Sequence, residues 1–203
     1  MAHGYLIPAQ QHRAEIVVVN SRFVTTIGYT PTVEDAKALL RAVRIEFADM
    51  HNHVYAYRVG YANSIIESMS DDGEPSGTAG PPVLAVLRGV DIGDTTVVVS
   101  RFFGGTKLGT GGLVRSYTKA AQEGFKTLPL ERKIMRRTVG LDAPYRFYEQ
   151  IRLLIDHYEG ISVEETFVDC VTLTAKFPVS QIEPFTAAVI ELTAGSVEPI
   201  ILE

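Results

Sequence analysis

Alternating and helical spacings of apolar residues divide the first part of the chain into two strands and a helix. Residues 15–19 and 22–28 are rich in β-branched side chains, and the polar pair between them predicts a hairpin. Thr32 followed three positions later by Asp35 resembles a capping box, which predicts a helix that begins there and ends near Met50. The apolar residues at helical spacing are Ala36, Leu39, Leu40, Val43 and Phe47.

Two glycine-rich loops each precede a predicted helix. The first, 71–80, is acidic and the second, 104–112, is basic. A Val-rich run between them is typical of a strand buried on both faces. The expected elements of this part are strands at 54–59, 64–69 and 95–101 and helices at 82–88 and 113–125.

After Pro129 the pattern begins again and follows the order β-α-β-β-α-β. The expected elements are a strand at 134–141, a helix from Ala143, strands at 164–167 and 171–177, a helix that ends at Gly195 and a strand at 197–202. Ser180 and Glu183 resemble a second capping box, ahead of the second helix. This order is the ferredoxin-like arrangement. We therefore expect two domains, 1–132 and 133–203.

Composition narrows the class of protein. The 203 residues are 46% hydrophobic and 21% charged, which is typical of a globular chain. The single cysteine, Cys170, cannot form an internal disulfide, and a strand position favours a buried, inert thiol. No apolar stretch reaches the length that a membrane span needs, and the N-terminus does not resemble a signal peptide. We expect a cytoplasmic protein with no contact to a membrane.

Charge is segregated along the chain. Residues 1–87 carry a net charge of −3, residues 88–137 one of +6, and residues 138–203 one of −8. The basic middle could form a face that attracts polyanions, whereas the last third would repel them. Chance clustering of ordinary surface charge is the alternative.

The basic loop is the strongest chemical signal. Glycines allow close approach of a ligand to the backbone, and a helix start offers unpaired N–H groups to an anion. The same reasoning applies to the start of the 82–88 helix, beside Gly77 and Thr78. The pattern is neither a phosphate-binding Walker loop nor a dinucleotide fingerprint, and the glycines could serve only tight turns. The candidate anion or nucleic-acid contacts are Gly77, Thr78, Arg101, Gly104, Gly105, Lys107, Gly109, Gly111, Gly112 and Arg115.

Two further clusters have both structural and chemical interpretations. Asp71, Asp72 and Glu74 could hold a hard cation, but we favour pairing with Arg101, Lys107 or Arg115, which would order the two loops. His51 and His53 could bind a metal or act as a base beside a strand. Without a third ligand a polar strand start is the better interpretation, so no metal site is predicted.

The two loops resemble those of the IMPACT/YigZ family. The first resembling segment is Asp71-Asp72-Gly73-Glu74-Pro75-Ser76-Gly77-Thr78-Ala79-Gly80, and the second runs from Arg101-Phe102-Phe103-Gly104-Gly105 to Gly111-Gly112-Leu113-Val114-Arg115. The Ser21-Arg22-Phe23 start and Tyr55-Ala56-Tyr57 fit as well, so the resemblance covers essentially the whole chain. It implies an α+β fold with an N-terminal ribosomal-protein-like βαβ domain, similar to domain IV of elongation factor G. A ferredoxin-like C-terminal domain, similar to domain V of that factor, would follow.

The resemblance also implies a role in translation control. Eukaryotic relatives interfere with activation of a starvation-responsive kinase, and bacterial relatives have no settled activity. We therefore expect a translation-linked regulatory factor, without enzymatic activity or a cofactor, that binds RNA or a ribosomal surface through the basic loop. Phe102, Phe103 and Tyr117 could stack on exposed bases, or lie in the core.

Two other classes of function remain open. One is an enzyme acting on a small phosphorylated or acidic substrate at the same loops, with Asp71, Asp72 or Glu74 as base or metal ligand and His53 nearby. Convergence of both loops and His53 on one closed pocket would favour it. The other is an adaptor that binds a protein partner through the acidic C-terminal domain.

Overall fold

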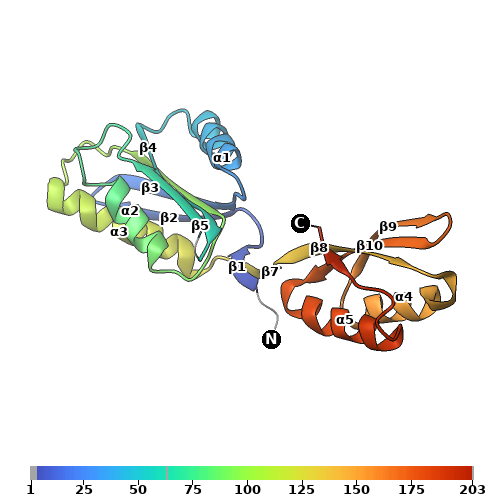
Figure 1. Ribbon diagram of the computed structural model, residues 1–203. Coiled ribbons are helices and arrows are strands. Elements are labelled where there is room, and N and C mark those ends of the chain that lie inside the picture. The colour runs from blue at the N-terminus through green and yellow to red at the C-terminus, as the bar shows by residue number, and fades with distance from the viewer. Residues whose placement is uncertain (1–3, 63, 203) are drawn as a thin grey trace. The chain divides into compact units, whose positions relative to one another are not determined.

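A computed structural model describes residues 4–62 and 64–202 (Figure 1). The chain forms two compact units. One is Tyr5–Lys133, and the other comprises Gly4 and the described residues from Ile134 onward. Within the described residues, no helix is long and apolar enough to span a membrane.

The first unit contains a five-stranded antiparallel sheet in the order β2-β3-β6-β4-β5. Its strands are β2 (His12–Val18), β3 (Ser21–Tyr29), β4 (Asn52–Tyr61), β5 (Ser64–Ser70) and β6 (Thr95–Phe102). The predicted hairpin is confirmed by the register of β2 on β3, and the strands expected at 54–59 and 64–69 pair with each other as β4 and β5. The Val-rich β6 lies at the centre and is buried at every position except Phe102, as its unbroken apolar run predicted.

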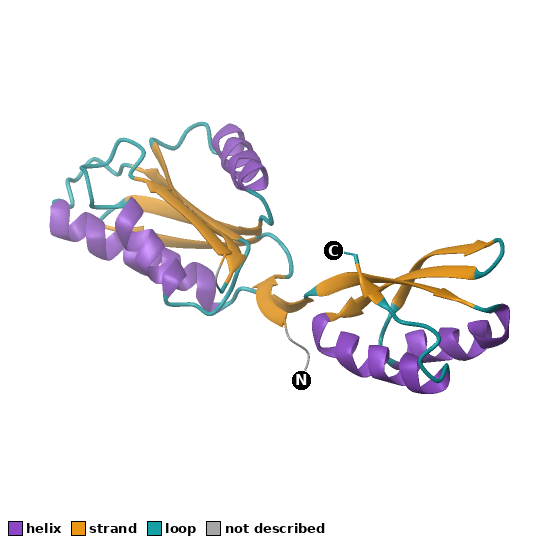
Figure 2. Cartoon of the chain, in the orientation of Figure 1, coloured by secondary structure: helices purple, strands orange, loops and turns teal. Residues whose placement is uncertain are grey.

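Three helices cover the two faces of this sheet. Helices α2 (Gly80–Arg88) and α3 (Thr110–Lys126) pack together on one face, and α1 (Val33–Glu46) lies on the other (Figure 2). Side chains alternate along β4 between the two faces of the sheet. Val54 and Ala56 lie in the core beneath α2 and α3, whereas Tyr57 packs on the α1 side.

The capping box of α1 is confirmed, since Thr32 and Asp35 bond reciprocally. The helix ends at Glu46 and not near Met50. Phe47 leaves the helical conformation with φ −108° and ψ 46°, and the Arg13 guanidinium lies over its ring.

A two-stranded ribbon that the sequence did not indicate lies beside the sheet. It consists of β1 (Gly4–Pro8) and β7 (Leu130–Ile134). Buried Asp94 holds it, because its carboxylate accepts bonds from the Tyr5 hydroxyl (2.5 Å) and the Gly60 N–H (2.7 Å) and pairs with Lys133 Nζ (2.6 Å). Ile134 ends β7, so the strand predicted at 134–141 begins only at Arg136.

The second unit has the ferredoxin-like fold. Its sheet order is β11-β8-β10-β9, antiparallel throughout, and both of its longer helices cover one face (Figure 1). Inward alternation along β10 is confirmed at Val171, Leu173, Ala175 and Phe177. The elements are β8 (Arg136–Ala143), a 3₁₀ turn (Tyr145–Phe147), α4 (Tyr148–His157), β9 (Ile161–Phe167), β10 (Val171–Pro178), α5 (Val179–Leu192) and β11 (Ile200–Ile201).

Prolines account for three differences from the predicted boundaries. Pro144 disfavours the helical conformation of the residue before it, so Ala143 remains in β8 and α4 starts only at Tyr148. The Ser180–Glu183 capping box is wrong, because Pro178 is the N-cap of α5 and Ser180 already lies inside its first turn. The strand predicted at 197–202 is reduced to Ile200–Ile201, after Pro199, which has no N–H to donate.

Candidate functional site

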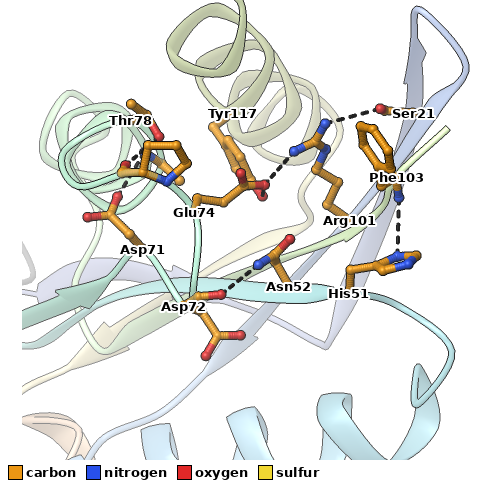
Figure 3. A network of polar contacts seen from close by, with 12 residues as sticks. Ser21, His51, Asn52, Asp71, Asp72, Glu74, Thr78, Arg101, Phe103 and Tyr117 are labelled. Atoms are coloured by element: carbon orange, nitrogen blue, oxygen red, sulfur yellow. Dashed lines mark hydrogen bonds and ion pairs between the residues drawn. The ribbon is translucent and has the colours of Figure 1, made fainter. Parts of the chain in front are cut away.

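Both glycine-rich loops lie at one end of the first unit's sheet, where β5 and β6 end and β4 begins (Figure 3). The first loop, 71–80, follows β5 and ends at the first residue of α2, and the second, 104–112, follows β6 and ends in the first turn of α3. Arg101, near the end of β6 and shortly before the second loop, donates to Glu74 of the first loop, which ties the first loop to that strand.

Asp71 closes the start of α2. Its Oδ1 accepts the N–H groups of Ala79 (2.9 Å) and Gly80 (2.8 Å), and its Oδ2 accepts that of Gly77 (2.9 Å). Thr78 donates both its N–H and its hydroxyl to the Pro75 carbonyl. The expectation that the amides at this helix start stay free for an anion is therefore wrong, because a carboxylate from the chain already occupies them.

The same contacts lower the pKa of Asp71. Burial alone would raise it, but the N–H donors of Gly77, Gly80 and Ala79 together outweigh burial and hold the pKa below its ordinary value. A carboxyl with a lowered pKa stabilises the folded state at neutral pH, and that stabilisation is lost as the pH falls through the lowered value.

We expect Asp71→Ala to lower the free energy of unfolding at pH 7 by about 2 kcal/mol, because it removes a charged cap that satisfies three N–H groups. Urea titrations at several pH values measure this, and the difference from the wild type should shrink in acid as Asp71 is protonated. Asp49→Ala, at an exposed carboxylate, is the control and should change little. Equal losses in both variants would contradict the capping role.

Glu74 and Arg101 form a buried ion pair. Their side chains are each only 6% exposed, and Arg101 Nη1 lies 2.7 Å from Glu74 Oε1. The Tyr117 hydroxyl from α3 donates to the same oxygen (2.8 Å), and Arg101 Nη2 donates to Ser21 Oγ (3.3 Å). Burial, with the neighbouring Glu74 charge, raises the pKa of Tyr117 far above its ordinary range.

This pair changes the role expected of Arg101. The guanidinium lies between the Phe23 and Phe103 rings, with its carbon 5.5 Å from each centroid. The Arg101 cation is buried and paired with Glu74, so the structure gives it the role of holding the first loop against the end of β6. Of the three basic partners considered for the acids, Arg101 is the one that the structure pairs with Glu74.

Asp72 connects the first loop to the α1 side of the unit. Its Oδ2 accepts the His53 backbone N–H (2.6 Å), its Oδ1 pairs with Arg44 (2.6 Å), and its carbonyl accepts the Asn52 side-chain amide (2.7 Å). All three acids of the loop are therefore engaged in ordering it.

His53 does not join the Arg101 cluster. Alternation along β4 directs Val54 toward α2 and α3, so His53 points to the opposite face, where its Nδ1 shares a 2.9 Å hydrogen bond with Ser100 Oγ. His51 instead accepts the Phe103 N–H at Nδ1 (3.3 Å). The described residues contain no group of three His, Cys, Asp or Glu side chains arranged to hold a metal ion.

His53 should give the fold an acid-sensitive step. Burial lowers its pKa from the ordinary value of 6.5, so between that value and its folded pKa the unfolded chain binds more protons than the folded chain. Stability should therefore fall as the pH drops below 6.5, with a slope of at most about 1.4 kcal/mol per pH unit. Denaturant titrations of His53→Gln should show a shallower slope in this window than those of the wild type. An unchanged slope in His53→Gln would contradict this assignment.

The start of α3 differs from that of α2. Its N-cap is Gly109, with φ +72°, which has no side chain to bond the first N–H groups, and no carboxylate among the described residues takes the place that Asp71 has at α2. Lys107 and Arg115 are exposed near it and Lys119 is exposed further along α3, and within the described part of the chain none of the three pairs with a carboxylate. Five of the predicted contacts lie at or near the start of α3, namely Lys107, Gly109, Gly111, Gly112 and Arg115. Three others belong elsewhere, since Gly77 and Thr78 precede α2 and Arg101 lies in the buried pair with Glu74.

A hollow of about 240 Å³ opens beside this helix start. Leu108, Gly112 and Arg115 line it with Ser116 and Lys119 of α3, and the turn between β2 and β3 contributes Val18 and Val19. Gly104 packs against that turn so closely that a Cβ would meet the Asn20 carbonyl oxygen at 2.0 Å, and Gly105 has φ +82°. These two glycines thus shape the second loop.

Sequence reasoning missed several participants. Ser21, Asn52 and the hydroxyl of Tyr117 reach the loops from other elements, and Lys119 adds a charge to the α3 hollow. The Tyr117 hydroxyl could not be identified from the apolar face of α3, because helical spacing indicates burial but not the partner. Lys119, four positions after Arg115, could have been found as a helical neighbour.

Comparisons with known proteins cover both units. The Impact N-terminal domain family matches residues 19–125, and the domain of unknown function DUF1949 matches residues 141–196. The chain is 34% identical over 201 residues to the "IMPACT family member YigZ" of Escherichia coli K12, covering 98% of each chain. It is 32% identical over 200 residues to an "IMPACT family member" of Haemophilus influenzae, covering 98% of this chain and 97% of that one. A solved structure titled "Crystal structure of an hypothetical protein" is 33% identical, covers 100% of this chain and 99% of its own, and has a TM-score of 0.76.

Proposed function

Because the chain belongs to the IMPACT family, we propose that it is a translation-linked regulatory factor that binds the phosphate backbone of RNA at the start of α3. Family membership supports the regulatory role at the level of the family. The observation that carries the RNA contact is the start of α3, whose glycine N-cap supplies no side-chain bond, with exposed Lys107 and Arg115 near it and no carboxylate paired to them in the described chain.

The physical basis is an electrostatic one. The N–H groups of Thr110, Gly111 and Gly112 are the first of α3, and the helix dipole places partial positive charge on them. Lys107 and Arg115 add full charges that a phosphate oxygen can meet. Such contacts position a backbone without reading its sequence, so binding should be salt-dependent and weakly selective.

The geometry gives less support to an enzyme at the same loops. The acids proposed as base or metal ligand are engaged, since Asp71 caps α2 and Glu74 is paired with Arg101. His53 faces the other side of the sheet and bonds to buried Ser100. A general base must reach the proton that it removes, and these groups do not converge on one pocket.

The test is RNA affinity as a function of salt concentration. We expect the double variant Lys107→Ala/Arg115→Ala to bind single-stranded RNA more weakly and to reduce the slope of log affinity against log salt by about 1.5, because two phosphate contacts are lost. Fluorescence anisotropy of a labelled oligonucleotide measures both quantities.

A matched control removes the same charge elsewhere. Lys37→Ala/Arg41→Ala changes two exposed cations on α1, on the opposite face of the sheet, and should leave the slope unchanged. A slope that is flat in the wild type, or that falls equally in both double variants, would overturn the proposal.

A further inference from the structure

Two neighbouring phenylalanines remain exposed at the end of an otherwise buried strand. Phe102 is 42% exposed and Phe103 37% exposed, although the other seven residues of β6 are buried. We infer that these rings, with His51, form a platform on which bases of an unpaired RNA strand stack. This inference rests on the proposed function and adds to it the class of RNA that is bound.

The platform is held in place by backbone contacts. The His51 N–H donates to the Arg101 carbonyl (2.8 Å), and its Nδ1 accepts the Phe103 N–H (3.3 Å), as Figure 3 shows for the second bond. The His51 ring meets the Phe102 ring edge to face, with centroids 5.1 Å apart and planes at 65°. Ring positions fixed in this way lose little conformational freedom when a base stacks on them.

The Arg101 pair supports the same surface from beneath. Its guanidinium lies over one face of the Phe103 ring and is itself fixed by Glu74 (Figure 3). Tyr117, the third aromatic residue considered for stacking, is fully buried and bonded to Glu74, so it cannot take part. The rings that remain available for stacking are His51 with Phe102, which meet edge to face, and Phe103 beside Arg101.

Only a short segment separates the platform from the cations at α3. Residues 103–109 connect Phe102 to Gly109, and within this loop Gly104 donates its N–H to Ser21 Oγ beside the β2–β3 turn. That turn contributes Val19 to the hollow lined by Arg115 and Lys119. A single strand can place its phosphates on the cations and turn its unstacked bases to the rings. A duplex keeps its bases stacked inside and cannot offer their faces.

The experiment compares three polymers of about a dozen nucleotides per strand: oligoadenylate, its duplex with oligouridylate, and an abasic strand that carries the same backbone charge as oligoadenylate. We expect the wild type to bind oligoadenylate about tenfold or more tightly than the abasic strand. Phe102→Leu/Phe103→Leu should remove that preference while keeping the salt slope, because the cations are untouched. Phe167→Leu, at a half-exposed phenylalanine of the second unit, is the matched control and should change neither.

The outcomes separate this inference from the proposed function. If the wild type binds all three polymers equally, with a salt slope that depends on Lys107 and Arg115, the stacking platform is overturned and the phosphate site stands. If no polymer binds with a salt dependence, both are overturned. Thermal unfolding of the phenylalanine variant checks that it is folded, and the comparison of oligoadenylate with the abasic strand in the wild type decides the question even where the variant does not fold.

Discussion

Replacing Arg101 with alanine should lower the free energy of unfolding by about 3–5 kcal/mol, because the Glu74 carboxylate would remain buried without its charge partner. Tyr117 would still donate to Glu74, but a single hydroxyl does not replace a guanidinium. The Phe23 and Phe103 rings would also lose their contact with the cation. Urea unfolding at pH 7 measures the loss.

A double-mutant cycle identifies the cause of this loss. Glu74→Gln/Arg101→Met leaves no isolated charge, and its destabilisation should be well below the sum of those of Glu74→Gln and Arg101→Met. Arg44→Ala, whose ion pair with Asp72 is more exposed, should cost about 1 kcal/mol or less. Additive single losses would show that the two side chains act independently and would contradict a coupled pair.

Asp94→Ala should have the second largest effect, a loss of about 3 kcal/mol in the free energy of unfolding. The carboxylate is buried and accepts two hydrogen bonds in addition to its pair with Lys133, which reaches solvent and so tempers the cost. Its backbone also has φ +47°, a conformation that alanine tolerates less well than aspartate or asparagine. Asp94→Asn should therefore recover part of the loss.

The pKa of Tyr5 provides a second measurement of the effect of Asp94→Ala. Burial, and then the hydrogen bond to Asp94, raise its pKa to about 12, so removal of the carboxylate should lower that pKa. Ultraviolet titration of the phenol at alkaline pH measures it. Asp91→Ala, at an exposed carboxylate that bonds Tyr61, is the control and should leave both the stability and the Tyr5 titration unchanged. A normal Tyr5 titration in the wild type would contradict the Asp94 contact.

The elements of both units could be predicted to a large extent from local patterns. Period-two alternation placed Val171 and Phe177 of β10 inward, and Thr32 with Asp35 marked the start of α1. These features depend on residues within a few positions of one another, where steric and hydrogen-bonding rules act directly. The predicted capping box at Ser180 was wrong for the same local reason, because Pro178 restricts the backbone before it and begins the helix earlier.

The candidate site could be predicted from the sequence only in part. The sequence singled out the two glycine loops and the start of α3, because a glycine-rich segment before an amphipathic helix is a local signal. It could not distinguish the two helix starts, since the cap of α2 comes from Asp71, eight and nine positions before the amides that it accepts. Nor could it tell that Arg101 is buried against Glu74, because 27 positions separate them and the charge of an arginine says nothing of its burial.

By itself the sequence determined the capping of α1, the order of strands and helices in the ferredoxin-like unit and the segregation of basic and acidic segments, because each follows from residue type and short-range spacing. Only the tertiary structure decided which charged side chains are buried in ion pairs and which remain exposed to solvent. The alternation of β4 sends His53 to the α1 face, and the packing of α3 brings Tyr117 to Glu74. Those choices depend on strand register and helix placement, which join distant parts of the chain and are not encoded in any one segment.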